Sequence, residues 1–329
     1  MNAPDPVLPE EKLQPARQLL AALRAEMAKA VIGQQAVVDQ LLIALLADAH
    51  VLIEGVPGLG KTLLVKALAR TFGGETRRIQ FTPDLMPSDV VGHTLFDAAT
   101  ARFVTRRGPV FTHLLLADEI NRAPAKTQSA LLEAMQEKQV TLDGTAAAMA
   151  RPFMVLATQN PIEQEGTYPL PEAQLDRFLL KIRIDYPSEA EEIALTRQVT
   201  QAKTGADLDV EAVATLIQPE TVVGLQQSAA HVTLDERVTA YAVAIARGSR
   251  ETPGLASGAG PRGAIALVRA ARARALIAGR GFATPDDIKA VALPALRHRV
   301  TPAAEAEIEG LGADDLLRAL LERVPAPRI

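Results

Sequence analysis

The eight residues Gly-Val-Pro-Gly-Leu-Gly-Lys-Thr at 55–62 constrain this 329-residue chain more than any other stretch. They match the pattern G-x-x-x-x-G-K-[ST], in which backbone N–H groups of a glycine-rich turn surround phosphates. An apolar run at 51–53 precedes the pattern, and a helical pattern follows it at 63–69. Because a phosphate loop lies between a strand and a helix, this context predicts nucleotide binding rather than a plain glycine-rich turn.

The residues expected around the phosphates come from this loop and the first turn of the helix after it. Lys61 is expected to reach the β and γ oxygens, and the hydroxyl of Thr62 to ligate Mg²⁺. The full phosphate-binding set is Gly55, Pro57, Gly58, Gly60, Lys61, Thr62 and Leu63. The predicted cofactors are therefore a nucleoside triphosphate and Mg²⁺.

A second signal lies at 114–119, where an apolar strand ends in two adjacent carboxylates. In P-loop proteins an acid at a strand end holds Mg²⁺ beside the loop hydroxyl, which fits Asp118 acting through a bound water. A carboxylate one residue later can polarise a water for in-line attack, which fits Glu119 as the catalytic base. A strand ending in a solvated acid pair is the alternative. Together with the phosphate loop, the pair favours hydrolysis over binding alone.

The order of the segments predicts an α/β fold. Residues 13–49 have the spacing of two helices that are separated at Gly33. Further along, β-type runs alternate with helical patterns, the runs being 77–81, 113–118, 153–158 and 179–184 and the helices 61–71 and 125–137. Such alternation predicts a parallel sheet covered on both faces. From residue 188 the β signal ends, so we expect a core domain at 1–186 and a helical domain at 187–329.

Three segments depart from this rhythm. Residues 82–108 are longer than an ordinary connection, and loops of that length are usually functional or contain extra elements. The sequence Thr-Leu-Asp-Gly at 141–144 is typical of a hairpin or turn. Within the helical domain, residues 249–263 are rich in Gly and Pro and predict a loop.

Composition excludes several classes of protein. No apolar run approaches the ~20 residues of a spanning helix, and the first residues, MNAPDPVLPEEK, are unlike a signal peptide. The chain has no cysteine, which excludes disulfides and fits a reducing compartment, and its five histidines lack metal-ligand spacing. A net charge of −4 with 3% aromatic residues disfavours nucleic acid, although a local basic patch could form on folding. We therefore expect a soluble, cytoplasmic protein without a membrane span.

Taken together, these residues resemble the MoxR family of AAA+ ATPases over about 31–300. The resemblance rests on Ile-Gly-Gln at 32–34, the phosphate loop, 114–137, 155–178 and Gly-Pro-Arg-Gly at 260–263, with 114–178 its most specific part. It implies a P-loop core with a five-stranded parallel sheet flanked by helices, an all-α lid, and usually a hexameric ring with ATP at subunit interfaces. Residues 82–108 would then carry the helix-2 insert, and 138–151 the hairpin before the first sensor.

The resemblance also implies roles for three polar residues. Asn160 matches a sensor that helps hold the attacking water, and an amide can both accept from water and donate to a phosphate oxygen. Arg177 matches an arginine finger that stabilises charge on the ATP of a neighbouring subunit. Arg262 matches a lid-borne second sensor that contacts the γ-phosphate. From the residues alone, a turn residue before Pro161 is the better interpretation of Asn160, and a loop charge that of Arg262. Arg177 could then form a salt bridge with Asp176 or Glu172.

Two assignments near the nucleotide depend on the same resemblance. Ile32 and Gly33 would lie near the adenine, and ATP rather than GTP is implied, consistent with the absence of the guanine-reading N-K-x-D motif. Arg122 could lie at an interface or on the surface.

Members of the family typically act as chaperone-like motors that mature or activate other proteins. They often work with a partner that bears a von Willebrand factor A domain, and frequently in metal-cofactor insertion. A nucleic-acid motor and a nucleotide-gated scaffold with little turnover are the alternatives. The acidic net charge weakens the first, and the intact set of Lys61, Asp118, Glu119, Asn160 and Arg177 weakens the second.

Overall fold

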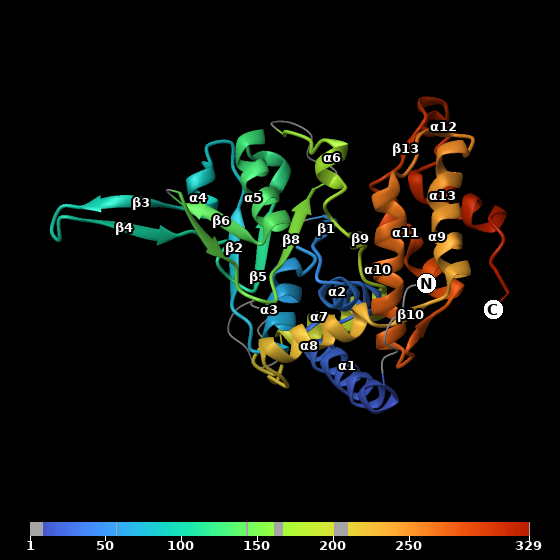
Figure 1. The fold of residues 1–329 in the computed structure, drawn as a ribbon, viewed down its shortest axis with the longest axis horizontal. Helices are drawn as coiled ribbons and strands as arrows, with labels where there is room; N and C mark the ends of the chain where they lie inside the picture. Colours follow the sequence, from blue (N-terminus) through green and yellow to red (C-terminus); the bar gives the residue numbers. More distant parts are fainter. Residues whose placement is uncertain (1–8, 57, 143, 161–166, 201–209, 329) are drawn as a thin grey trace, which may run out of the picture.

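The structure, a computed structural model, describes residues 9–56, 58–142, 144–160, 167–200 and 210–328. At its centre is a sheet of five parallel strands in the order β2-β5-β8-β1-β9 (Figure 1). The strands are β1 (Val51–Glu54), β2 (Thr76–Gln80), β5 (Leu114–Asp118), β8 (Met154–Gln159) and β9 (Leu180–Arg183). The predicted α/β core with a five-stranded parallel sheet is confirmed.

Helices cover both faces of this sheet. They are α1 (Glu10–Ala30), α2 (Gln35–Leu46), α3 (Lys61–Thr71) and α5 (Ala125–Glu137). Along β1, Val51 and Ile53 belong to the hydrophobic cluster that contains α1, α2 and α3, whereas Leu52 belongs to the cluster that contains α5. Successive side chains of a strand point to opposite faces, so both faces are buried. This double burial explains why the core strands are continuous apolar runs in the sequence.

Two hairpins extend from the core. The 82–108 segment contains the short helix α4 (Pro87–Val91) and the antiparallel strands β3 (Gly92–Asp97) and β4 (Arg102–Arg107). Figure 1 shows this hairpin projecting away from the body of the molecule. A second hairpin pairs β6 (Gln139–Leu142) with β7 (Thr145–Ala148), around the turn expected there. The naming of these two segments as insert and pre-sensor hairpin stays a prediction.

The C-terminal part is helical, as predicted. Its helices are α7 (Glu189–Thr200), α8 (Pro219–Ala230), α9 (Glu236–Gly248), α10 (Pro261–Ile277), α11 (Pro285–Leu296), α12 (Ala304–Ile308) and α13 (Ala313–Arg323). Two short strand pairs accompany them, namely β10 (Thr233–Leu234) with β12 (Phe282–Ala283) and β11 (Leu255–Ser257) with β13 (Thr301–Pro302). Strands of two or three residues are too short to give an alternating pattern, so the sequence did not predict them.

The loop expected at 249–263 is more ordered than its composition indicates. It contains a 3-10 turn, η2 (Ser249–Glu251), then β11, and its last residues already begin α10. The Ser249 hydroxyl accepts from Ala259 N–H at 2.8 Å and donates to Ala246 O at 2.7 Å. These buried bonds satisfy the local backbone without extended secondary structure.

The chain just after the core returns to it. Ala214 N–H donates to the Glu26 carboxylate at 2.8 Å, and Leu216 N–H donates to Thr71 O at 2.9 Å. The Gln226 amide donates to Leu45 O at 2.8 Å. Residues from both sides of the expected boundary thus share one hydrophobic cluster. The division into 1–186 and 187–329 stays a prediction.

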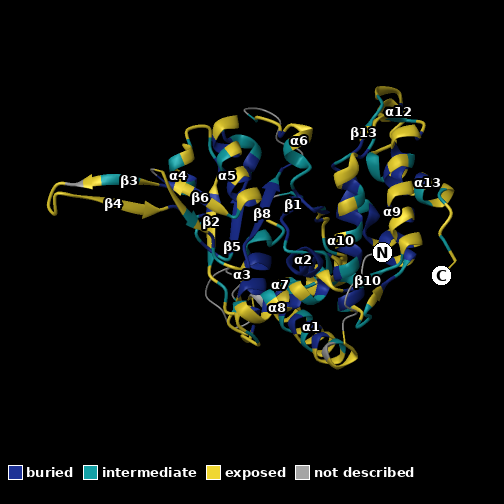
Figure 2. Ribbon diagram, in the orientation of Figure 1, coloured by how far each residue is buried: buried dark blue, intermediate teal, exposed yellow. Residues whose placement is uncertain are grey.

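Burial follows these layers. Figure 2 shows the inner strands β1, β5 and β8 of the sheet buried, whereas the edge strand β2 and the β3–β4 hairpin are mostly exposed. Among the described residues, no helix combines the length and the apolar character that crossing a membrane requires.

Candidate nucleotide-binding and hydrolysis site

The phosphate loop follows the carboxyl end of β1 and leads into α3. Gly58 and Gly60 adopt φ values of +88° and +74°, and no atom lies within 4 Å of where a Cβ would be. Gly55 instead lies against the chain, since a Cβ there would be 2.7 Å from Ile184 O. The glycines therefore provide left-handed turns and a close backbone approach, which this loop type requires. Pro57 lies outside the described residues.

Lys61 is the first residue of α3 and is partly buried. Its Nζ donates to Gly55 O at 2.5 Å, across the loop. Burial lowers the pKa of the Lys61 ammonium, while Asp118 and Glu119 act in the opposite direction. Lys61 and the acid pair are thus close enough to interact electrostatically. Thr62 follows, partly exposed, in the same helical turn.

The acid pair lies at the carboxyl end of β5. Asp118 is buried and its carboxylate accepts from the Thr158 hydroxyl at 3.1 Å and from Arg78 Nε at 2.6 Å. Glu119 has φ of 55°, and its N–H donates to the same Thr158 hydroxyl at 2.9 Å. The left-handed turn directs the two successive carboxylates differently, one toward the buried strand end and one outward.

Glu119 has two further partners at its Oε2. Gln80 Nε2 donates to it at 2.9 Å, and Arg122 Nε lies 2.9 Å from it. Arg122, which the sequence left open as an interface or surface residue, therefore pairs with the expected catalytic base in this structure. Asn160, 8% exposed, comes directly after β8. Because β8 lies between β1 and β5, Asn160 lies at the carboxyl ends of the strands, between the phosphate loop and the acid pair.

The turn at 32–34 lies beside the phosphate loop. Gln34 Nε2 donates to Leu59 O at 3.1 Å, and Ile32 is partly buried. Gly33 has φ of +72°, and a Cβ there would be 2.6 Å from the Glu191 side chain of α7. The turn is thus packed between the loop and α7, which is consistent with a position near the base of a bound nucleotide.

Arg177 and Arg262 lie elsewhere, near the amino-terminal ends of the sheet strands. Arg177 comes before β9, and it lines a cavity of about 400 Å³ together with His50, which comes before β1. The phosphate loop follows the other end of β1. A four-residue strand rises about 13 Å. The structure therefore brings together the loop, Asp118, Glu119 and Asn160, and separately brings Arg177 and Arg262 together.

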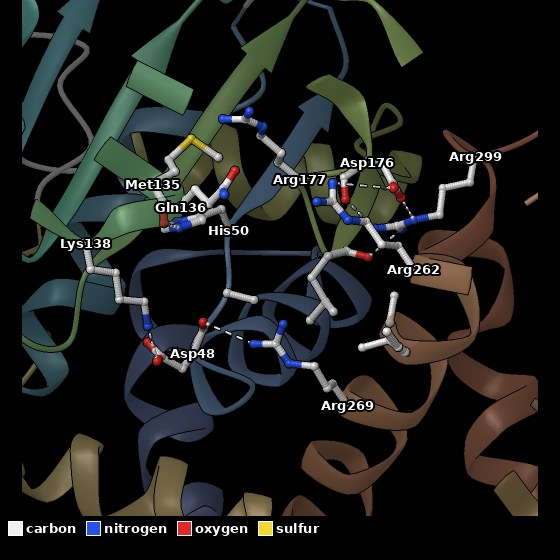
Figure 3. Close-up of a pocket in the computed structure, with 14 residues that line it drawn as sticks. Asp48, His50, Met135, Gln136, Lys138, Asp176, Arg177, Arg262, Arg269 and Arg299 are labelled. Carbon is white, nitrogen blue, oxygen red and sulfur yellow. Dashed lines mark hydrogen bonds and ion pairs between the residues drawn. The ribbon is translucent and has the colours of Figure 1, made fainter. Parts of the chain in front are cut away.

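This cavity is rich in cations (Figure 3). Arg177 Nη1 donates to Leu132 O at 2.7 Å, and Arg262 Nη1 lies 3.7 Å from Asp176 Oδ2. Five cationic and two acidic side chains line it, namely Lys138, Arg177, Arg262, Arg269 and Arg299 with Asp48 and Asp176. The excess of positive charge favours an anion in this cavity.

Several residues that build both sites were given no role by the sequence. Thr158 and Arg78 hold Asp118, and Arg299 holds the segment around Arg177. A threonine in a buried strand and an arginine after a helix carry no signal in one sequence, because their partners are over 30 residues away in the chain.

A phosphate loop after strand β1 and an acid pair at the end of β5 define a P-loop ATPase. Residues 50–180 match the family model described as "ATPase family associated with various cellular activities (AAA)", and 247–320 match the AAA lid domain. The chain is 41% identical to Chaperone MoxR1 of Mycobacterium tuberculosis, over 92% of this chain and 81% of that protein. It is 34% identical to Protein MoxR of Methylorubrum extorquens, over 94% and 96%.

A solved structure supports the same family assignment. The crystal structure of a candidate ATPase from Cytophaga hutchinsonii superposes with a TM-score of 0.89 at 40% identity, covering 97% of this chain and 98% of that one. The chain belongs to the MoxR family of AAA+ ATPases.

Proposed function

We propose that this ATPase works as a ring, with six subunits as the expected number, in which each subunit completes the site of its neighbour and the ring remodels or activates a client protein. The observation that carries this proposal is the position of Arg177. It lies near the amino-terminal ends of the strands, whereas the phosphate loop of the same chain lies at their carboxyl ends. Arg177 therefore cannot serve its own nucleotide and needs a second copy.

The described residues fit ATP with Mg²⁺. The loop is open at Gly58 and Gly60, and hard oxygen ligands are available from Thr62 and Asp118. Lys61 would hold the phosphate oxygens, and Thr62 would hold the metal directly with Asp118 acting through water. Mg²⁺, when bound, would neutralise negative charge on the phosphates.

Hydrolysis would depend on this chain's acid pair and sensor. Glu119 takes a proton from the attacking water, and Asn160 orients that water. Glu119 exchanges its bond to Arg122 for the water when it acts. The guanidinium of Arg177, from the neighbouring subunit, stabilises the transition-state charge.

The proposal includes Arg262, which we place toward the ATP of a neighbouring subunit and not toward that of its own. The resemblance implies contact with a γ-phosphate, and Arg262 lies beside Asp176 in the Arg177 cavity. We therefore assign both arginines to the ATP of the neighbouring subunit. The excess of cations in this cavity supports that assignment.

The client surface is proposed to be the β3–β4 hairpin. Phe96 and Phe103 are 55% and 76% exposed and pack edge to face, with ring centroids 5.4 Å apart. A lone two-stranded ribbon has no core of its own, so exposed aromatics there are available for contact. The relative from Mycobacterium tuberculosis is named Chaperone MoxR1, which supports a chaperone role. A partner with a von Willebrand factor A domain and metal-cofactor insertion are part of this proposal through the resemblance alone.

The test of the shared site mixes two inactive variants. Lys61→Ala and Arg177→Ala proteins should each be nearly inactive, because one lacks the phosphate contact and the other the donated guanidinium. In a random equal mixture, about one interface in four joins an intact Lys61 to an intact Arg177, so activity should recover toward a quarter of wild type. An Arg177→Ala protein that hydrolyses ATP at the wild-type rate on its own would contradict the proposal.

A nucleic-acid motor remains the second candidate, because one observation favours it. Arg102, Arg106 and Arg107 are exposed on the same hairpin as the two phenylalanines. Arginine beside aromatic rings is also the composition of single-strand binding surfaces. ATPase assays with and without single-stranded or duplex DNA separate the two functions, since strong stimulation by DNA would favour the motor.

A further inference from the structure

The backbone around Arg177 is held by one buried guanidinium, that of Arg299. This side chain is 4% exposed and comes just after α11. Its Nη2 donates to Asp176 O at 3.1 Å and to Phe178 O at 2.7 Å, the carbonyls immediately before and after Arg177. Its Nη1 donates to Leu179 O at 3.1 Å. The lid therefore contacts the main chain on both sides of Arg177.

The remaining donors of Arg299 complete the arrangement. Nε donates to Asp176 Oδ1 at 2.7 Å, and Nη1 also donates to Ala295 O at the end of α11. All five N–H groups of the guanidinium therefore have acceptors. His298 Nε2 donates to Phe178 O as well, at 2.9 Å. A single planar group thus joins α11 to the start of β9.

Asp176 connects this arrangement to Arg262. One carboxylate oxygen accepts from Arg299, and the other lies 3.7 Å from Arg262 Nη1 on α10 (Figure 3). Arg262 is the more exposed of the two, so its ion pair is the weaker one. Asp176 thus directly precedes Arg177 in the chain, pairs with Arg262 and is held by Arg299. The positions of both arginines that we assign to the neighbour's ATP therefore depend on Asp176.

We propose that Arg299 is a positioning residue that fixes Arg177, and through Asp176 also Arg262, relative to the lid, so that lid orientation in one subunit sets catalysis on the ATP of its neighbour. This inference rests on the proposed function, because it requires Arg177 to act on a neighbouring site. Arg299 touches no nucleotide in it. Displacing a catalytic group by about 1 Å can cost up to 100-fold in rate, so backbone control of Arg177 is a sufficient cause.

The test uses Arg299→Lys, which keeps the charge but has only three N–H donors on a single nitrogen and cannot bridge the four carbonyls and the carboxylate that Arg299 contacts. The turnover number should fall about 10-fold to 100-fold, while the KM for ATP changes much less. Asp176→Asn is the second variant, because it leaves the backbone acceptors in place should Arg299→Lys not fold. Arg318→Lys is the matched control, since Arg318 is an exposed lid arginine that, within the described part of the chain, pairs with Asp315 three residues earlier.

Mixing experiments distinguish positioning from general damage. Arg299→Lys subunits should recover activity with Lys61→Ala subunits, which donate an intact Arg177 and Arg299. They should not recover with Arg177→Ala subunits, because both variants are then defective as donors. The reference mixture of Lys61→Ala with Arg177→Ala must recover, or the proposed function itself fails.

Three outcomes would overturn the inference alone, given a recovering reference mixture. Recovery of Arg299→Lys with Arg177→Ala would assign the defect to its own nucleotide site. Recovery with neither partner, for Arg299→Lys and Asp176→Asn alike, would mean general structural damage. Wild-type turnover of both variants alone would mean that Arg177 needs no such support.

Discussion

The hydroxyl of Thr158 links the two acids of the site, donating to Asp118 Oδ1 at 3.1 Å while it accepts from the Glu119 N–H at 2.9 Å. Thr158 is 2% exposed and lies on β8, the strand next to the one that carries both acids. The buried hydroxyl thus has a partner both as a donor and as an acceptor. It fixes the backbone turn at Glu119 and the carboxylate of Asp118 together.

Thr158→Val should therefore impair hydrolysis without creating a cavity in the core. The shape is kept, but a buried N–H and a carboxylate oxygen each lose a partner, which costs about 1–3 kcal/mol. We expect the turnover number to fall about 10-fold or more and the melting temperature to drop by a few degrees. Thr158→Ser should restore both. Full activity of the valine variant in a steady-state assay would show that the hydroxyl does not position the acids.

Lys61→Ala and Glu119→Gln should separate binding from turnover. Loss of the Lys61 ammonium removes about 2–4 kcal/mol of contact with the phosphates, roughly a 30- to 1,000-fold loss of ATP affinity. Glu119→Gln should keep its affinity and lose about 100- to 10,000-fold in turnover, since an amide cannot take the proton. Calorimetric titration with ATP and a single-turnover assay measure the two effects. Equal losses of affinity would contradict this division of roles.

Specific ATPase activity should rise with protein concentration. A site completed by the Arg177 of a neighbour exists only in the assembled state, and ATP should favour that state because it would bridge two subunits. Light scattering run alongside the activity assay should show assembly and activity rising together. A fully active monomer across the concentration range would exclude the shared site.

Acid should destabilise the protein partly through His50. The imidazole lies in the core between β8 and α5, with Nδ1 accepting from Val155 N–H at 3.0 Å and Nε2 donating to Met135 O at 3.1 Å. Burial lowers the pKa of His50 to about 4. The unfolded state then binds the proton first, so stability present above about pH 6.5 is lost as the pH falls toward 4, by about 3 kcal/mol.

His50→Gln provides the test, because a glutamine amide can both accept and donate a hydrogen bond but does not titrate. Chemical unfolding from pH 7 to pH 4 should show a shallower loss of stability than in wild type. His231→Gln, at an exposed histidine, is the control and should leave the wild-type slope. An unchanged slope for His50→Gln would mean that His50 does not contribute to acid sensitivity.

The glycines and the acid pair made the phosphate site predictable from sequence. Gly58 and Gly60 lie within a few residues of Lys61, so the loop geometry, the strand before it and the helix after it are all encoded locally. The adjacent positions of Asp118 and Glu119 at the end of an apolar strand are local in the same sense. Parallel packing then followed from the alternation of strands and helices.

What the tertiary structure alone decided is which of these groups share a surface. Thr158 reaches Asp118 over 40 residues of chain, and Arg299 reaches Phe178 over 121. The packing likewise places Asn160 between the loop and the acids at the carboxyl ends of the strands. It places Arg177 and Arg262 near the opposite, amino-terminal ends. Contacts at such separations depend on how the elements pack, and packing is cooperative over the whole core. Local residue patterns therefore predict the nucleotide chemistry, whereas only the fold placed Arg177 at the end of the strands opposite the phosphate loop, which is the basis for our proposal that a second subunit completes the site.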